Sequence, residues 1–280
     1  MKVRAPVNRI VPFSAVDGPG NRTAVFLQGC SFNCLYCHNP ETIRPCDNCG
    51  ICLSACPTGA IRREGAAVCY DCSLCVLCDA CIRACPKSSC PRLRWLSGEE
   101  TMAEICKNMP FIRGVTVSGG ECTLHRDYLL DLAELAHGEG LSLLLDSNGS
   151  FDFAADPALT AAVDGVMLDV KAWDAAEHLR LCGQPNDAVL NNLCFLARTG
   201  KLAEVRTVLV PDEMNAAETV GMVSRSLTAL GATAVPYKLI RFRPMGVRTT
   251  YKHFRAPSQA ELDALEALAR SEGMERILQI

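Results

Sequence analysis

The stretch "TAVFLQGCSFNCLYC" (residues 23–37) joins an apolar run to three closely spaced cysteines. Residues 23–29 have the length and apolar continuity of a buried parallel strand. Cys30, Cys34 and Cys37 follow with C-x3-C-x2-C spacing. Three thiolates on a four-iron cluster leave one iron without a protein ligand, and that iron can bind a further group. The stretch therefore predicts a cluster-binding loop directly after a strand.

Similar apolar runs recur along the chain and alternate with helical patterns. The runs lie at 114–119, 141–146, 165–170, 204–210 and 236–242, and the clearest helical patterns at 126–140, 215–231 and 258–272. Six such units favour parallel strands in either a doubly wound sheet or a partial barrel. In both architectures the C-terminal strand ends carry the functional groups. This predicts one neighbourhood for Cys30, Ser118 to Glu121, Asp146 and Asp169.

Composition and charge exclude several function classes. The formal net charge of the 280 residues is −3 and no basic tract stands out, so nucleic acid is not an expected partner. No apolar run has the length of a membrane span or a signal peptide, so we expect a cytoplasmic protein without membrane contact. Eleven of the eighteen cysteines fall into three spaced sets between Cys30 and Cys85, which favours metal or cluster ligation over disulfides.

Residues 39–98 interrupt the strand–helix alternation. They are dense in Cys, Pro and Gly and have no helix or strand pattern of normal length. We expect a small insert whose core is built around bound metal, within an α/β core formed by residues 1–38 and 99–280.

The insert contains two matching runs, "CDNCGICLSACP" (46–57) and "CVLCDACIRACP" (75–86). Both read C-x2-C-x2-C-x3-C-P, the spacing of bacterial two-cluster ferredoxins, where the fourth cysteine ligates the other cluster. Random placement of the cysteines would give one such run roughly 0.0003 times. The crossed pattern assigns one [4Fe–4S] cluster to Cys46, Cys49, Cys52 and Cys85, and the other to Cys75, Cys78, Cys81 and Cys56.

Zinc is the alternative ligand for paired CxxC motifs. Neither Cys69 nor Cys72 starts a run with the full spacing, because Asp79 and Ile82 would then take the fourth position. We expect both to be bystanders. The isolated cysteines are expected to be small buried residues, namely Cys90, Cys106, Cys122, Cys182 and Cys194.

The sequence resembles the radical SAM superfamily, whose open cluster iron chelates S-adenosylmethionine. "TVSGGECTL" (116–124) resembles the GGE motif of these enzymes. The whole of "DGPGNRTAVFLQGCSFNCLYCHNP" (17–40) looks like the signature of the glycyl-radical-enzyme activating enzymes, and "LDSNG" (145–149), "VMLDVK" (166–171) and "EVRTVLVP" (204–211) align with the family's later strands. The likeness covers essentially the whole chain and is closest to the YjjW subgroup. It implies a partial (β/α)6 barrel with an inserted two-[4Fe–4S] ferredoxin domain.

The resemblance also implies roles for individual residues. S-adenosylmethionine would be flanked by Tyr36, Cys37 and His38, with its methionyl end near Gly119, Gly120, Glu121, Asp169, Val170 and Lys171. A monovalent-cation site would be formed by Asp146, Ser147, Asp169 and the Met167 backbone. Asp17 and Arg206 would face the glycine loop of a partner protein. Where the family often carries a histidine after the sixth strand, this chain has Arg243, whose role is left open.

The implied activity is that of an activase, and the implied cofactors are three [4Fe–4S] clusters and S-adenosylmethionine. The expected protein substrate is a glycyl radical enzyme, the expected electron donor is of flavodoxin or ferredoxin type, and the chain is expected to be a monomer. Two alternatives stay open at this stage. One is radical chemistry on a small molecule or a Cys/Ser peptide, and the other is a plain electron-transfer iron–sulfur protein.

Overall fold

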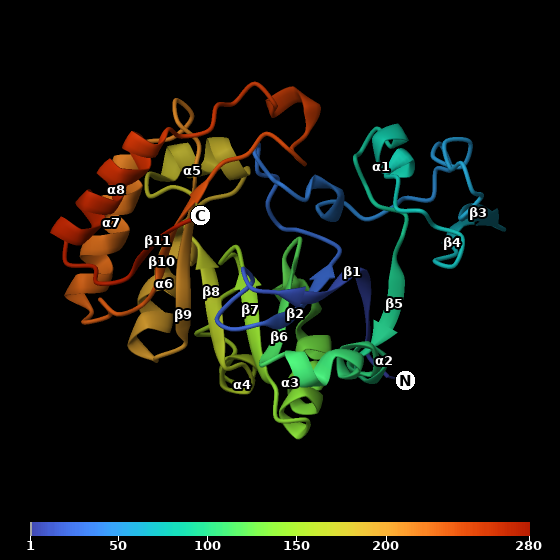
Figure 1. The fold of residues 1–280 in the computed structure, drawn as a ribbon, viewed down its shortest axis with the longest axis horizontal. Coiled ribbons are helices and arrows are strands. Elements are labelled where there is room, and N and C mark those ends of the chain that lie inside the picture. Colours follow the sequence, from blue (N-terminus) through green and yellow to red (C-terminus); the bar gives the residue numbers. More distant parts are fainter. Residues whose placement is uncertain (1) are drawn as a thin grey trace.

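A computed structural model describes residues 2–280 and contains one large and one small sheet. The large sheet has nine strands in the order β11-β10-β9-β8-β7-β6-β2-β1-β5 (Figure 1). Its strands are β1 (Arg4–Ser14), β2 (Arg22–Leu27), β5 (Arg94–Ser97), β6 (Gly114–Gly119), β7 (Ser142–Ser147), β8 (Gly165–Asp169), β9 (Leu202–Leu209), β10 (Tyr237–Arg241) and β11 (Ile277–Gln279).

The six strands predicted from apolar runs form the centre of this sheet. These six strands are β2, β6, β7, β8, β9 and β10, and each pairs in parallel with the next strand of this series. A doubly wound sheet reverses its strand order at a switch point, whereas here the order is sequential, as in a barrel. The parallel-rich α/β fold is therefore confirmed, and of the two architectures left open by spacing, the strand order matches the barrel.

Three strands of the large sheet were not predicted. Strand β1 pairs antiparallel with β2 and β5, and the short β11 extends the other edge parallel to β10. The sequence of β1 mixes apolar residues with Arg9 and two prolines, and seven of its eleven residues are not buried, so it lacks the continuous apolar signal of a central strand. Strand β5 lies inside the range expected for the insert, yet it belongs to the main sheet.

Helices pack along the sheet and bury a single large apolar core against it. They are α2 (Gly98–Ile105), α3 (Arg126–Gly138), α4 (Pro157–Ala162), α5 (Ala175–Cys182), α6 (Asp187–Arg198), α7 (Ala216–Ala229) and α8 (Gln259–Ser271), with 3-10 turns η2 (Cys106–Phe111), η3 (Cys122–His125) and η4 (Thr249–Tyr251). The side chain of Asn215 accepts a hydrogen bond from Glu218 N, so Asn215 caps the N-terminus of α7. No helix within residues 2–280 is both long and apolar enough to cross a membrane.

The cysteine-rich segment stands away from the main sheet on the side of β5 (Figure 1). It holds η1 (Pro40–Thr42), the hairpin of β3 (Ile61–Glu64) and β4 (Ala67–Tyr70), and the short helix α1 (Ala80–Ala84). Its own core contains just three buried side chains, Cys52, Ile61 and Cys81. The segment leaves and returns through a narrow neck, where Cys90 N donates to Glu41 O at 3.1 Å and Ser89 Oγ donates to Arg44 O at 2.7 Å.

Candidate active site

A cavity of about 150 Å³ opens at the C-terminal ends of the central parallel strands. Its lining includes residues of the loop after β2, namely Cys30, Cys34, Tyr36, Cys37 and His38. The other lining residues lie at or just after the ends of three strands: Ser118, Gly119 and Gly120 at β6, Asp146, Ser147 and Asn148 at β7, and Asp169 and Lys171 at β8. The structure thus brings together most of the residues expected to share one neighbourhood. Glu121, a member of that set, does not line it, and neither does Val170, which the resemblance placed near the methionyl end of the ligand.

The loop that carries the three cysteines is fixed by backbone hydrogen bonds on two sides. Cys30 N donates to Ile43 O at 3.0 Å on one side. On the other, Asn33 N donates to Cys182 O at 2.9 Å, at the C-terminal end of α5. Arg248 adds a third anchor, because its guanidinium donates to the carbonyls of Asn33 and Cys34. The loop is therefore held in place by protein contacts alone.

The three thiols differ in their electrostatic surroundings. Burial raises the pKa of the Cys30 and Cys37 thiols to about 12. The pKa of Cys34 is lowered to about 7, chiefly because the buried thiol of Cys182 hydrogen-bonds to it. Iron is bound by thiolates, so loading this loop would release protons, most of all from Cys30 and Cys37.

Gly119 and Gly120 allow the end of β6 and the loop after it to lie close to the end of β2 and to Gly29, which precedes the cysteine loop. A Cβ atom at Gly120 would lie 2.0 Å from Gly29 O, and one at Gly119 would lie 2.2 Å from Leu27 O. Gly119 also has φ of +121°, which disfavours other residues. Both positions therefore require glycine, and they expose backbone instead of side chains to the cavity.

Glu121 lies where the sequence does not predict it. Its side chain is fully buried, and its carboxylate accepts hydrogen bonds from Asn148 N at 2.7 Å, Ser147 Oγ at 3.0 Å and Thr123 Oγ1 at 2.7 Å. Burial raises the pKa of Glu121, while these donors favour its charged form. The carboxylate connects the loops after β6 and β7, because it accepts hydrogen bonds from Thr123 N in the first loop and from Asn148 N in the second.

Charged groups from β7 and β8 lie on one wall of the cavity. Lys171 Nζ is 2.7 Å from Asp169 Oδ2, and Ser118 Oγ donates to Asp146 Oδ2 at 2.8 Å. Burial raises the pKa of Asp146. The side chain of Val170 is buried in the core, and the Val170 backbone N–H donates to Arg206 O at 2.8 Å. The wall therefore offers a carboxylate–ammonium pair beside the cysteine loop.

Two aromatic side chains complete the cavity. Tyr36 is almost fully buried, and its hydroxyl has no hydrogen-bond partner within the described residues. The His38 ring stacks on Phe242, with ring centroids 5.7 Å apart, and its Nε2 lies 2.8 Å from the backbone oxygen of Arg243. The Arg243 side chain is exposed and does not line the cavity, so only its backbone takes part.

Asp17 and Arg206 do not line the cavity either. Arg206 is nearly buried in the interior beneath it, and its Nη2 reaches Val16 O at 3.3 Å. Lys238 Nζ donates to the same Val16 oxygen at 3.3 Å. The Asp17 carboxylate accepts a hydrogen bond from Ser14 Oγ. In this conformation the loop containing Asp17 therefore lies across the buried cations of β9 and β10.

The insert contains two small cavities, each lined by four cysteines. One is lined by Cys46, Cys49, Cys52 and Cys85, and the other by Cys56, Cys75, Cys78 and Cys81. Within residues 2–280, no three or more His, Cys, Asp or Glu side chains are grouped to hold a single ion. In a four-iron cluster each thiolate bonds a different iron, so its ligands stand further apart than those of one ion. Cys69 and Cys72 line neither cavity.

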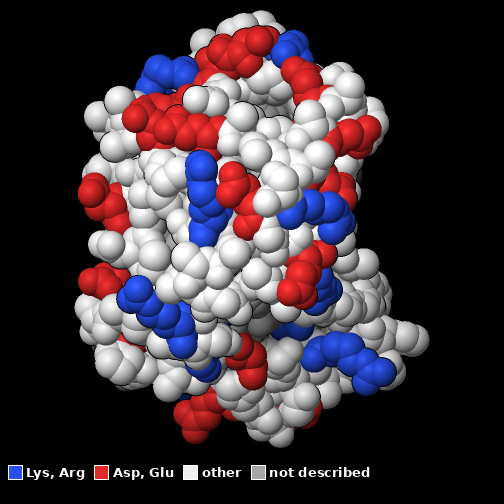
Figure 2. All heavy atoms as spheres, turned by 90° about the vertical axis from the view of Figure 1, so that its left-hand side faces the viewer, with Lys and Arg blue, Asp and Glu red and all other residues white. Residues whose placement is uncertain are grey.

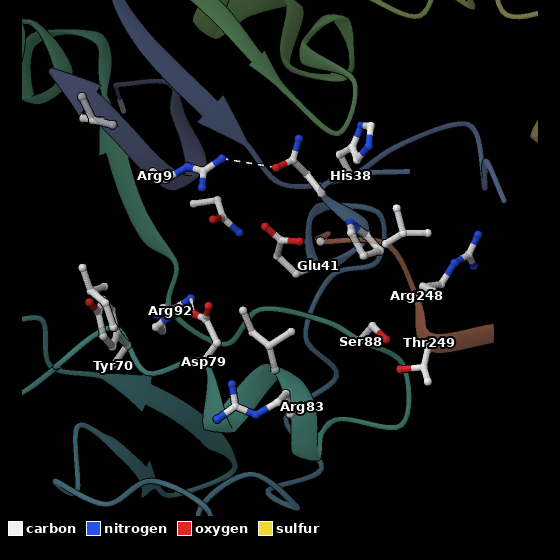
Figure 3. A pocket seen from close by; sticks show the side chains of 18 of the residues that line it. Arg9, His38, Glu41, Tyr70, Asp79, Arg83, Ser88, Arg92, Arg248 and Thr249 are labelled. Atoms are coloured by element: carbon white, nitrogen blue, oxygen red, sulfur yellow. Dashed lines mark hydrogen bonds and ion pairs between the residues drawn. The ribbon is translucent and has the colours of Figure 1, made fainter. Parts of the chain in front are cut away.

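A larger cleft of about 1050 Å³ separates the insert from the core. Figure 3 shows Arg9 and His38 on its core side, facing Tyr70, Asp79, Arg83 and Arg92 on the insert side. Six cationic side chains line it, Arg9, Arg83, Arg92, Arg94, Arg248 and Lys252, against the acidic Glu41 and Asp79. By contrast, both signs of charge are spread over the face formed by α7 and α8 (Figure 2). The cleft is therefore locally cationic in a chain of net negative charge.

Sequence reasoning did not identify Asn148, Cys182 or Arg248, all of which contact the cysteine loop. Asn148 lies in the quoted "LDSNG" motif, so its position beside the expected cation ligands was a usable signal. Cys182 was expected to be an ordinary buried cysteine; it is buried, but its thiol also lies against Cys34. Arg248 carries no sequence signal, because its contact spans more than two hundred residues.

Comparisons with known proteins agree with this geometry. The model of the Radical SAM superfamily matches residues 24–220. A Haemophilus influenzae protein named for glycyl-radical enzyme activation is 31% identical over 100% of this chain and 98% of its own length. The chain belongs to the glycyl-radical-enzyme activating enzymes of the radical SAM superfamily.

A second relative of this radical SAM chain is the indoleacetate decarboxylase activating enzyme of Tractidigestivibacter scatoligenes. It is 29% identical over 99% of this chain and 98% of its own length. Among solved structures, a domain of pyruvate-formate lyase-activating enzyme from Bacteroides vulgatus superposes with a TM-score of 0.52 at 20% identity, covering 60% of this chain and 98% of that one. The likeness to this solved structure is one of fold. The YjjW subgroup stays a prediction.

Proposed function

We propose that the protein is an activase that cleaves S-adenosylmethionine reductively and removes one hydrogen atom from a backbone glycine of a partner glycyl radical enzyme. The observation that carries this function is the cavity at the strand ends, where Cys30, Cys34 and Cys37 meet the Gly119–Gly120 backbone. Membership of the activating-enzyme family supplies the reaction.

The residues present fit a [4Fe–4S] cluster with one open iron. Three thiols line a single cavity, and the polar groups around them leave room for a further ligand. When bound, such a cluster supplies the electron that breaks the sulfonium C–S bond, and the resulting 5′-deoxyadenosyl radical takes the glycine hydrogen. The contacts of the loop with Ile43, Cys182 and Arg248 would keep the three sulfurs in place.

S-adenosylmethionine would be oriented by groups on three walls of the cavity. The Gly119 and Gly120 backbone would receive the amino group, and Lys171 would pair with the carboxylate. Tyr36 and His38 would lie beside the adenine, which would give the unpartnered Tyr36 hydroxyl a nearby polar group. Asp146, Ser147, Asp169 and the Met167 backbone would hold a monovalent cation.

The insert would hold two further [4Fe–4S] clusters with crossed ligation. The crossed ligation is supported by the linings of the two small cavities. Each cavity contains the first three cysteines of one C-x2-C-x2-C-x3-C-P run and the last cysteine of the other run. Anaerobic reconstitution with iron and sulfide should give about twelve iron atoms per chain. Replacement of Cys46, Cys49 and Cys52 by serine should remove about four. A wild-type count near four, or tightly bound zinc, would contradict the assignment.

The cationic cleft would dock the acidic face of a flavodoxin- or ferredoxin-type electron donor. An occupant of the cleft would touch both the insert, through Arg83, and the cysteine loop, through His38. Opposite charges steer protein association and raise its rate. Reversing Arg83 and Lys252 to glutamate should slow electron transfer from reduced flavodoxin at low salt. Arg198→Glu, exposed on α6, should leave the rate unchanged.

The partner's glycine loop would reach the cavity past Asp17 and Arg206. Because Arg206 and Lys238 hold the Val16 carbonyl in the present conformation, we infer that the loop around Asp17 rearranges when the partner binds. The decisive experiment mixes the reduced protein, S-adenosylmethionine and a glycyl radical enzyme encoded nearby, and records the EPR spectrum. A glycine-centred doublet supports the activase; 5′-deoxyadenosine release without that doublet contradicts the assigned substrate.

A further inference from the structure

The side chain of Asn148 lies between the loop after β7 and the cysteine loop. Its Nδ2 is 3.6 Å from Cys30 Sγ and 3.2 Å from Ser31 Oγ. Its Oδ1 accepts a hydrogen bond from Ser150 N at 2.9 Å. A backbone N–H can only donate, so Oδ1 must face Ser150. The amide hydrogens of Asn148 are therefore directed at the Cys30 sulfur and the Ser31 hydroxyl.

Glu121 fixes the backbone from which this amide projects. Its Oε2 accepts the Asn148 N–H at 2.7 Å, and its Oε1 accepts Ser147 Oγ at 3.0 Å. Thr123 donates to the same Oε1, through N at 3.1 Å and Oγ1 at 2.7 Å. Both oxygens are thus bound by donors in an interior where an unpaired carboxylate would be costly. The loops after β6 and β7 are consequently locked together, with Asn148 only 6% exposed.

We propose that Asn148 donates an N–H···S hydrogen bond to Cys30 when that thiolate holds the cluster, and that Glu121 acts as the positioning residue for this donor. The proposal rests on the function proposed above and extends it to the control of the cluster's reduction potential. A donor aimed at a ligand sulfur favours the more negative, reduced state. No bond forms or breaks in this step, because one electron from the donor protein enters while the proton stays on Nδ2.

The test uses the full-length protein, anaerobically reconstituted. Asn148→Asp is nearly isosteric and keeps an oxygen for the Ser150 N–H, but it replaces the donor by a negative group. Asn148→Ala removes the side chain without adding charge. Ser150→Ala is the matched control, because it keeps the backbone N–H that orients Asn148. It removes the Ser150 hydroxyl, whose contact is Ser31 Oγ at 2.6 Å and not the Cys30 sulfur. Iron content and melting temperature show whether each variant is folded and loaded.

An EPR-monitored redox titration measures the effect on the relevant cluster. The signal to follow is the one whose shape changes when S-adenosylmethionine is added, since this identifies the cluster with the open iron. At the potential where this cluster of the wild type is half reduced, Asn148→Asp should lower the ratio of reduced to oxidised cluster by about tenfold. Asn148→Ala should lower it less, and Ser150→Ala should match the wild type.

The outcomes separate this proposal from the function on which it rests. If the loaded Asn148→Asp variant titrates like the wild type, the hydrogen bond to Cys30 is refuted while the activase function stands. If Asn148→Asp does not retain its iron, the loaded Asn148→Ala variant is titrated instead, and a wild-type potential in that variant refutes the hydrogen bond to Cys30. If no cluster signal of the wild type responds to S-adenosylmethionine, the proposed function itself fails.

Discussion

Arg206 Nη1 lies 3.0 Å from Asp146 Oδ1, so β9 and β7 are joined by an ion pair across the intervening strand β8. The same guanidinium contacts Glu204 through Nε at 2.5 Å, and Glu204 Oε2 pairs with Lys238 Nζ at 2.8 Å. These four side chains form a chain of alternating charge beneath the active-site cavity. These side chains are largely shielded from water, so each buried charge needs the opposite charge of its neighbour to offset the cost of its desolvation.

The first prediction concerns the cost of breaking this chain. Arg206→Met would leave the Asp146 and Glu204 carboxylates without their shared cation, so the free energy of unfolding should fall by about 3–5 kcal/mol. Anaerobic urea denaturation followed by circular dichroism measures the change. In the control Arg180→Met, an exposed pair with Glu213 is lost, and the fall should stay below about 1 kcal/mol. Equal effects for the two variants would contradict the prediction.

The second prediction concerns the close approach at Gly120. Gly120→Ala places a methyl group against Gly29 O, so the loop after β6 must move away from the cysteine loop. We expect a loss of about 2 kcal/mol or more of stability and weaker retention of the cluster nearest to Cys30. Gly138→Ala, at the open end of α3, meets no atom within 4 Å and should be neutral or stabilising. Melting temperature and iron content distinguish the two.

The third prediction is a pH dependence of stability from His178. This residue is fully buried, its Nδ1 donates to Gln184 O at 2.7 Å, and burial lowers its pKa below 6.5. Below about pH 6.5 the unfolded chain takes up a proton that the folded chain resists, so stability falls as the pH decreases toward the folded-state pKa. The slope contributed is at most about 1.4 kcal/mol per pH unit.

His178→Gln should therefore flatten the acid side of the stability curve, measured by urea denaturation between pH 5 and 7. Part of the slope should persist, because burial also lowers the pKa of His38. His253→Gln changes an exposed histidine and should leave the curve parallel to that of the wild type. An unchanged slope in His178→Gln would contradict the assignment.

The fourth prediction concerns the two cysteines outside the four-cysteine cavities. Cys69 lies on β4, and Cys72 lines the cationic cleft. Replacing both by serine should leave the iron content per chain unchanged, because neither lines a cluster cavity. Replacing Cys75, Cys78 and Cys81 serves as the comparison and should remove about four iron atoms. Iron loss in the Cys69/Cys72 variant would make one of them a ligand.

The order and spacing of neighbouring residues in the sequence were sufficient to predict the features that depend on short segments of the chain. Apolar continuity identified the six central strands, and the two-residue spacing of Glu204 and Arg206 is what places both on one face of β9. Pattern could not reveal that Glu121 turns toward Asn148, since that depends on two loops meeting in space. It likewise missed β1, whose Pro6 and Arg9 weaken the strand signal, and the contact of Lys238 with Glu204.

The hydrogen bond between Cys90 N and Glu41 O, with that of Ser89 to Arg44, closes the base of the insert. Since the chain departs and returns at nearly the same point, residues 45–88 form a detachable module. A gene encoding a short bridge from Arg44 to Ser89 would preserve every strand pairing of the large sheet. The eight cysteines that line the two small cavities can therefore be removed together, without cutting the loop that carries Cys30, Cys34 and Cys37.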